Sequence, residues 1–177
     1  MSDTQNIIKF LENCSVEVTP NGAAKIENFR DVLRDGTTVF VTFLPGSDIK
    51  TTVATVKRLH AEGMKPVPHF AARSMPSKAF LEENLKVCQD ECGVDEALLI
   101  GGGVDTPVGD FSSAKEILRL DLLQKYGIKK LGIAGHPEGS PDIPPADVIS
   151  ALLDKNAYAK QSGIEMYITT QFCFEAE

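Results

Sequence analysis

The sequence predicts an α/β protein, a (β/α)8 TIM barrel that is incomplete here, with about six βα units present and the last two missing. Short β-branched apolar runs alternate with amphipathic helical segments, and most of these segments are followed by a glycine. No unit carries the G-x-G-x-x-G turn of a dinucleotide-binding Rossmann fold. The chain stops at Glu177, directly after a predicted strand, which would leave a strand edge unpaired. We therefore expect one partial barrel domain over residues 1–177, completed by a longer chain or by a partner.

The individual elements follow from short apolar runs, capping residues and glycine stops. The predicted strands cover residues 15–18, 38–43, 66–69, 97–100, 130–134 and 166–172. The predicted helices cover residues 5–12, 23–34, a segment from Ser47 or Asp48 to Gly63, one from Ser77 to Gly93, one from Ser112 or Ser113 to Gly127, and 146–161.

Composition and charge exclude several classes of partner. The net charge is −7 and the 18 basic residues are scattered, so neither nucleic acid nor an anionic membrane surface is expected to bind. No apolar run reaches the length of a membrane span, and the first ten residues lack the pattern of a secretory signal. We expect a cytoplasmic chain whose four cysteines are free thiols. Cys88 and Cys92 continue a helical apolar stripe and are interpreted as core residues.

Candidate functional residues fall where the predicted strands end. In a parallel barrel the chemistry gathers at the carboxyl ends of the strands. These positions hold Glu17, Thr42, His69, the run Gly101–Gly103, the segment His136–Glu138, and Gln171. A polar side chain within an apolar strand needs a partner or a purpose. Packing explanations stay open for each one: Glu17 could pair with a cation, and His69 could be a satisfied core imidazole.

Three longer motifs carry a resemblance to a known family. They are Pro68-His69-Phe70-Ala71-Ala72-Arg73, the run Gly132–Pro141 with the sequence GIAGHPEGSP, and Thr170-Gln171-Phe172-Cys173-Phe174-Glu175. In this order and spacing the chain resembles a divergent, bacterial-type member of the methylenetetrahydrofolate reductase family. The resemblance implies bound FAD, reduction of that flavin by NAD(P)H, and conversion of methylenetetrahydrofolate to methyltetrahydrofolate or the reverse.

The resemblance also assigns roles to particular residues. Glu17 would be the catalytic general acid, a role that suits a carboxyl group in a poorly solvated site. Gln171 and Phe172 would bind the substrate. Gly103 stands where the family has an aspartate, and Asp105, two residues on, is the candidate to substitute for it. The cofactor would be bound by Thr42, His69, Ile100, Gly101, Gly103, Phe111, Ala134, His136, Lys155 and Asn156.

Two alternatives from other classes stay open at this point. Glu17, His69 and His136 could instead be the ligands of a metal-dependent barrel hydrolase. The chain could also be a non-catalytic folate- or flavin-binding homologue that needs another chain to act. The favoured interpretation has no metal, and it leaves open whether the protein forms a homo-oligomer.

Overall fold

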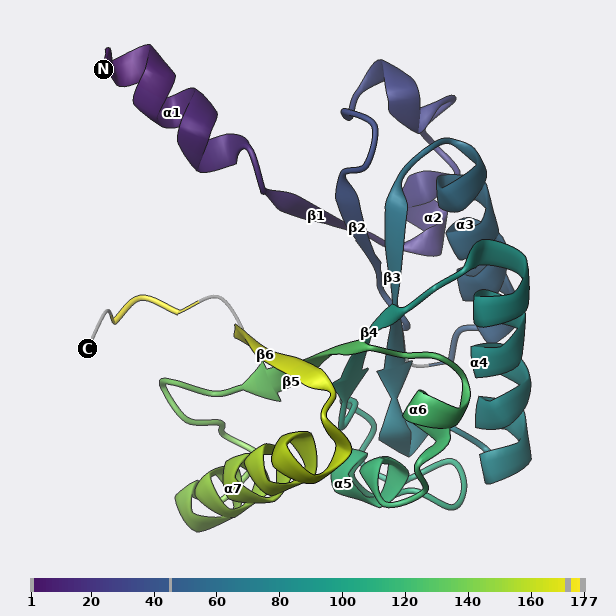
Figure 1. The fold of residues 1–177 in the computed structure, drawn as a ribbon. Coiled ribbons are helices and arrows are strands. Elements are labelled where there is room, and N and C mark those ends of the chain that lie inside the picture. Colours follow the sequence, from purple (N-terminus) through teal and green to yellow (C-terminus); the bar gives the residue numbers. More distant parts are fainter. Residues whose placement is uncertain (1, 45, 171–172, 176–177) are drawn as a thin grey trace.

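Six parallel strands form the centre of the computed structural model, which describes residues 2–44, 46–170 and 173–175 (Figure 1). The strands pair in chain order, β1 to β6, and every pair is parallel. All six predicted strands are confirmed, within two residues at each end, and residues 171–172 of the last prediction lie outside the described residues. Their bounds are β1 Ser15–Val18, β2 Thr38–Val41, β3 Lys65–Ala71, β4 Glu96–Ile100, β5 Lys130–Gly135 and β6 Glu165–Thr170.

The main helices begin and end at the predicted signals. Asp48 caps α3 by accepting a hydrogen bond from the Lys50 N–H at 2.9 Å, and Ser77 caps α4 in the same way through Phe80. Gly93 and Gly163 end α4 and α7 in the left-handed conformation, which glycine adopts without strain. The helices are α1 Asp3–Leu11, α2 Pro20–Ala23, α3 Ile49–Ala61, α4 Lys78–Cys92, α5 Ala114–Leu118, α6 Leu122–Lys125 and α7 Pro145–Ser162.

Two predicted helices are shorter than the sequence suggests. The segment 23–34 contains only the end of α2 and the 3-10 turn η1 (Phe29–Asp31). The helix predicted from Ser112 or Ser113 to Gly127 is divided into α5 and α6 by Asp121, whose φ is +52°. In both places the apolar spacing alone is compatible with one helix. A local cap or turn, at Asn28 in the first segment and at Asp121 in the second, interrupts it.

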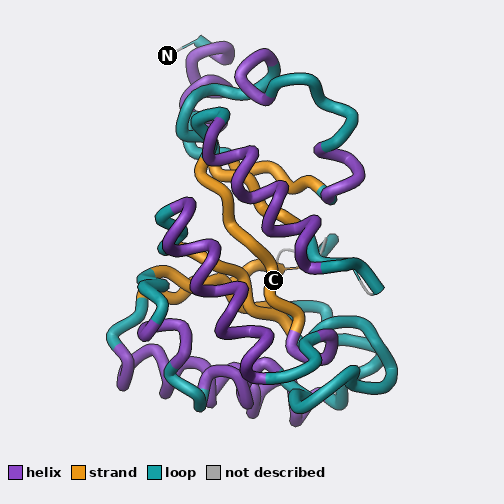
Figure 2. Tube along the Cα trace, turned by 90° about the vertical axis from the view of Figure 1, so that its right-hand side faces the viewer, coloured by secondary structure: helices purple, strands orange, loops and turns teal. Residues whose placement is uncertain are grey.

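The helices α2 to α7 cover one face of the sheet, while α1 stands apart from it (Figures 1 and 2). Val39, Val41 and Leu99 point toward these helices and have almost no exposed surface. Cys88 and Cys92 lie in the same hydrophobic core, which confirms their interpretation as packing residues. Among the residues described, no helix has both the length and the apolar character that crossing a bilayer requires.

The other face of the sheet carries the alternate residues of each strand. The register aligns Glu17 with Phe40, and it aligns His69 with Leu98, Gly132 and Tyr167 on successive strands. Tyr167 lies across Gly132: a methyl group on Gly132 would come within 2.9 Å of the tyrosine hydroxyl and 2.8 Å of Leu98. The sheet is curled, and this face is its inner face (Figure 1).

The predicted (β/α)8 TIM barrel is wrong, even as an incomplete one. In the part of the chain that the structure describes, β1 pairs only with β2 and β6 only with β5, so the curled sheet stays open. The α/β class and the parallel strands are confirmed. Strand–helix alternation fixes parallel pairing and the side on which the helices pack, but closure requires the first and last strands to pair, and no local pattern encodes that contact.

Candidate functional site

Glu17 and His69 meet on the inner face of the sheet, at the ends of β1 and β3. One Glu17 carboxylate oxygen lies 3.7 Å from Nε2 of His69. The two side chains differ in their surroundings, because that of Glu17 is 61% exposed and that of His69 only 5%. The expected proximity of these two residues is therefore observed, but the expected poorly solvated environment of Glu17 is not.

His69 is held as a buried, neutral imidazole. Burial lowers its pKa from 6.5 to about 4, so the ring is uncharged at neutral pH. Its edge packs against Phe40, with ring centroids 5.8 Å apart, and Nε2 has no hydrogen-bond partner in the structure. A buried polar nitrogen without a hydrogen-bond partner is costly. The acidic group beside it is the Glu17 carboxylate.

Thr42 adds a second buried polar atom to this end of the sheet. Its N–H donates to the Val18 carbonyl at 3.0 Å, which continues the pairing of β1 with β2 by one residue. Its hydroxyl oxygen is buried and has no hydrogen-bond partner in the structure. Ile100 and Ala134 end β4 and approach the end of β5, both half-buried. Four of the predicted cofactor residues thus lie along one edge of the sheet.

The loop after β4 is organised by Arg73, a residue to which sequence reasoning gave no role. The Arg73 guanidinium donates to the carbonyls of Val104, at 2.7 Å, and Asp105, while its backbone N–H donates to Gly101 at 2.8 Å. Gly102, with φ of +93°, is the glycine that the backbone requires, whereas a side chain at Gly101 or Gly103 would meet open space. An arginine directly after one strand can donate several hydrogen bonds to the carbonyl groups of a long loop after the neighbouring strand, and this is the signal that could have identified Arg73.

Phe111 lies near the end of the same loop. Its side chain is buried within the hydrophobic core instead of at the edge of the sheet. Gly109, two residues earlier, packs so tightly that an added methyl group would come within 2.0 Å of the Pro76 carbonyl oxygen. The loop conformation therefore places Phe111 among packing residues, where it is not available to stack on a ligand.

Lys155 and Asn156, adjacent on α7, have different environments. Lys155 is buried, burial lowers its pKa, and its amino group donates to the Ala134 carbonyl at 3.2 Å. Asn156 is exposed on the outer surface of the helix. Lys155 thus supports the end of β5 from the helix side, and the structure does not bring Asn156 to the edge of the sheet.

The segment after β5 contacts the end of the described chain. His136 is half-buried and its carbonyl accepts from Gly139 at 3.1 Å. The Glu138 carboxylate accepts from the backbone N–H groups of Phe174 and Glu175, the latter at 2.7 Å. The predicted substrate residues Gln171 and Phe172 lie outside the described residues.

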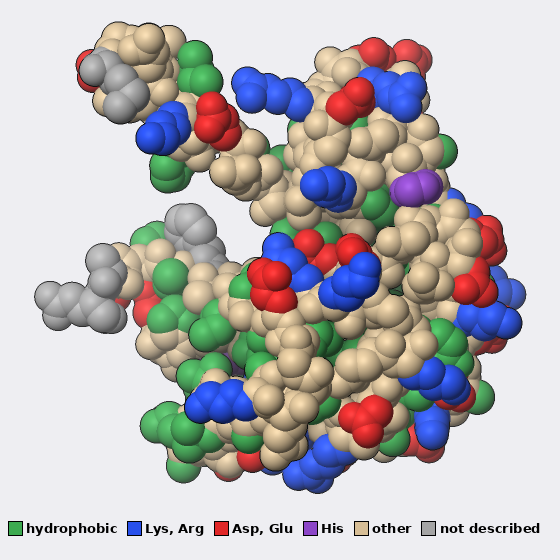
Figure 3. All heavy atoms as spheres, in the orientation of Figure 1, with side chains coloured by type: hydrophobic (Ala, Val, Ile, Leu, Met, Phe, Trp, Pro, Cys, Tyr) green, Lys and Arg blue, Asp and Glu red, His purple; other side chains and the backbone are tan. Residues whose placement is uncertain are grey.

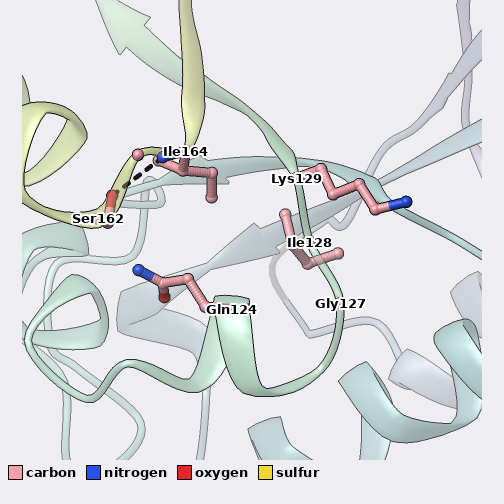
Figure 4. A pocket seen from close by; sticks show the side chains of 7 residues that line it. Gln124, Gly127, Ile128, Lys129, Ser162 and Ile164 are labelled. Carbon is pink, nitrogen blue, oxygen red and sulfur yellow. Dashed lines mark hydrogen bonds between the residues drawn. The ribbon is translucent and has the colours of Figure 1, made fainter.

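A pocket of about 350 Å³ lies at the opposite end of the sheet, between the ends of α6 and α7 (Figure 4). It is shallow and largely apolar. Its charged residue, Lys129, also pairs with Asp95 at 3.7 Å. The pocket does not include the Glu17–His69 pair, and the site is therefore assigned from side-chain chemistry and not from cavity size. The pocket is lined by Gln124, Gly127, Ile128, Lys129, Ser162, Gly163 and Ile164.

The metal-hydrolase alternative has no support. Within the described ranges no three His, Cys, Asp or Glu side chains gather as metal ligands. Glu17, His69 and His136 therefore do not form the triad that this alternative requires, although the first two are neighbours.

No family model matches the chain. A solved structure that it resembles is the lysine decarboxylase from Selenomonas ruminantium, at 16% sequence identity and a TM-score of 0.34. The similarity covers 87% of this chain, and the chain spans 35% of the length of the decarboxylase. A likeness this weak carries no argument about function. The fold itself defines the class of the protein, an α/β protein with an open, curled sheet of six parallel strands.

The assignment to the methylenetetrahydrofolate reductase family is therefore wrong. No family model matches the chain, and its open sheet is not the barrel that this family implies. The flavin-dependent reductase activity falls with the family, as does the homologue alternative. The folate and nicotinamide partners followed only from this resemblance and lose their basis. The three motifs fall at or after strand ends, where residues reflect the local turn and the polar rim of any parallel sheet, and such local likeness does not by itself establish a shared function.

Proposed function

We propose that the protein binds a small molecule at the carboxyl edge of its curled sheet, where Glu17 exchanges a proton with the ligand. The observation that carries the proposal is the pairing of an exposed carboxylate with a buried imidazole nitrogen that lacks a partner, 3.7 Å away. Parallel sheets bind ligands outside the carboxyl ends of their strands, which is where this pair lies.

The neutral state of His69 gives the pair its chemistry. A neutral imidazole has one N–H group and one bare nitrogen. With the proton on Nδ1, Nε2 accepts a hydrogen bond from a protonated Glu17. With the proton on Nε2, it donates to the ionised carboxylate. His69 thereby supports both protonation states of Glu17 without gaining charge itself, and the exposed Glu17 side chain has room to close the remaining distance.

FAD, expected from the sequence, remains a ligand to test, but the residues fit only part of it. The Thr42 hydroxyl and Nε2 of His69 lie at this edge of the sheet without partners, but both atoms are buried beneath the surface that a flat ring would cover. Phe111 lies in the core, Lys155 is already hydrogen bonded, and Asn156 faces outward, so the residues expected to bind the rest of FAD do not face that edge. Riboflavin, the part of FAD that carries the ring, is therefore the first ligand to test.

The test is a binding titration on wild-type protein and two variants. The chain has three tyrosines and no tryptophan, so quenching of tyrosine emission reports ligands that absorb in the near ultraviolet. We expect Glu17→Gln to weaken binding of riboflavin or another bound ring compound about tenfold, which corresponds to one charged hydrogen bond. Glu165→Gln, at the amino end of β6, is the matched control and should bind like wild type.

Two results would contradict this proposal. Equal affinity of wild type and Glu17→Gln for every ligand that binds would remove Glu17 from the site. Loss of affinity in Glu165→Gln, with Glu17→Gln unaffected, would move the site to the other end of the sheet. Uptake or release of protons on binding, measured by calorimetry in buffers of different ionisation enthalpy, should vanish in Glu17→Gln.

A further inference from the structure

Helix α1 has a complete N-terminal cap, but none of its residues is buried against the rest of the described structure. Ser2 and Gln5 form a reciprocal capping box at its start. None of its residues is buried, and the side chain of Phe10 is 86% exposed. Figure 3 shows α1 standing clear of the remaining surface. A nine-residue helix is marginal in water by itself, so its stability calls for a surface against the apolar face.

That apolar face is continuous. At 100° per residue Ile7, Ile8, Phe10 and Leu11 fall on one side of α1, and all four are exposed. Asp3 lies one turn before Ile7 on the same side. The face therefore combines an apolar patch near the end of the helix with one negative charge at its start.

Helix α7 also exposes an apolar face, but with a charge of the opposite sign. Its inner side contacts α5 and, through Lys155, the Ala134 carbonyl of β5. Ile149, Leu152 and Leu153 are exposed on its outer side. Lys160, in the last turn, falls on the same line as Ile149 and Leu153. This face combines an apolar patch near the start of the helix with one positive charge at its end.

We propose that α1 of one copy docks antiparallel on the outer face of α7 of a second copy of this chain. Asp3 and Leu11 are about 12 Å apart along α1, and Lys160 and Leu153 about 10 Å apart along α7, at 1.5 Å per residue. The antiparallel arrangement therefore sets leucine against leucine and Asp3 against Lys160. Within one molecule α1 and α7 lie at opposite ends in both views, which favours a partner copy (Figures 1 and 2).

A two-fold axis makes the contact reciprocal, so that each dimer contains two α1–α7 contacts. Both patches belong to the same chain, and each is matched in length, apolar character and charge by the other. Two small helix contacts without a buried sheet interface correspond to a transient dimer that dissociates on dilution. This interface is independent of the carboxyl edge of the sheet and does not rest on its proposed function.

Sedimentation velocity across about 1 µM to about 1 mM protein tests the interface. We expect wild type to shift from monomer to dimer within this range, and Leu11→Ser or Leu153→Ser to remain monomeric. Val32→Ser, an exposed apolar residue elsewhere on the surface, is the matched control and should dimerise normally. Because α1 has no buried residues, Leu11→Ser should leave thermal unfolding of the monomer unchanged.

A charge exchange separates this arrangement from other dimers. Asp3→Lys alone should weaken dimerisation roughly threefold to tenfold, because two exposed ion pairs become repulsive. Combining it with Lys160→Asp should restore wild-type affinity at low salt. A monomer at every concentration overturns the proposal. So does a dimer that survives Leu11→Ser and Leu153→Ser, or a charge exchange that fails to restore affinity.

Discussion

The centre and the two edges of the sheet differ in how much of their surface is covered. Six of the seven residues of β3 are buried, and α3 and α4 bury six and five residues against the sheet. At the edges β6 has no fully buried residue, α7 buries only Lys155, and α1 buries none. The fold is therefore stabilised mainly by β2 to β5 with α3 and α4, while the edges hold surface that is available for binding.

The candidate site lies across the boundary between these regions. Glu17 comes from edge strand β1 and stays exposed, whereas His69 comes from central strand β3 and is buried. The buried imidazole with a lowered pKa lies beside an accessible carboxylate, and perturbed pKa values cluster at functional sites. The difference in burial between the central strand β3 and the edge strand β1 therefore sets the environment of both residues of the candidate site.

Two isoleucines that face each other in the register, Ile133 on β5 and Ile168 on β6, test the difference in coverage between the centre and the edge of the sheet. Ile133 is 2% exposed and Ile168 52%. Ile133→Ala should lower the free energy of unfolding by about 2–5 kcal/mol, because it leaves a cavity in the core. Ile168→Ala should cost less than about 1 kcal/mol. Urea denaturation measures both, and equal costs would show that β6 is as well covered as β5.

His69 should make stability depend on pH in a defined window. Its folded pKa of about 4 lies below the unfolded value of 6.5, so the unfolded chain binds more protons between these values. The stabilisation is fully present above pH 6.5 and is lost as the pH falls toward 4, by about 3 kcal/mol in total. Denaturation curves of wild type and His69→Gln should differ in this slope.

Gly132 marks the border between centre and edge on the inner face. An alanine there would meet Leu98 at 2.8 Å and the Tyr167 hydroxyl at 2.9 Å, so we expect Gly132→Ala to cost about 1–3 kcal/mol through overpacking. Removing the ring in Gly132→Ala/Tyr167→Ala should recover part of this cost in a double-mutant cycle. Strict additivity of the two changes would contradict the crowding that the coordinates show.

Sequence reasoning succeeded where the signal is local. The six strands, the caps at Asp48 and Ser77 and the stops at Gly93 and Gly163 follow from residues close in the chain. The meeting of Glu17 with His69 was also expected, because parallel strands bring their carboxyl ends together. The burial of Phe111 in the core could not be predicted in this way. Its surroundings come from the loop that Arg73 organises through carbonyl groups about thirty residues away.

The order of residues alone determined the α/β class, the direction of the strands and the positions of the polar side chains at their ends, because hydrophobic periodicity and capping act over a few residues. Only the folded chain decided that the sheet stays open, that His69 is buried while Glu17 is not, and that α1 and α7 keep apolar faces uncovered. These properties depend on which distant segments meet, and the free energy of such contacts is set by the surface they exclude from water.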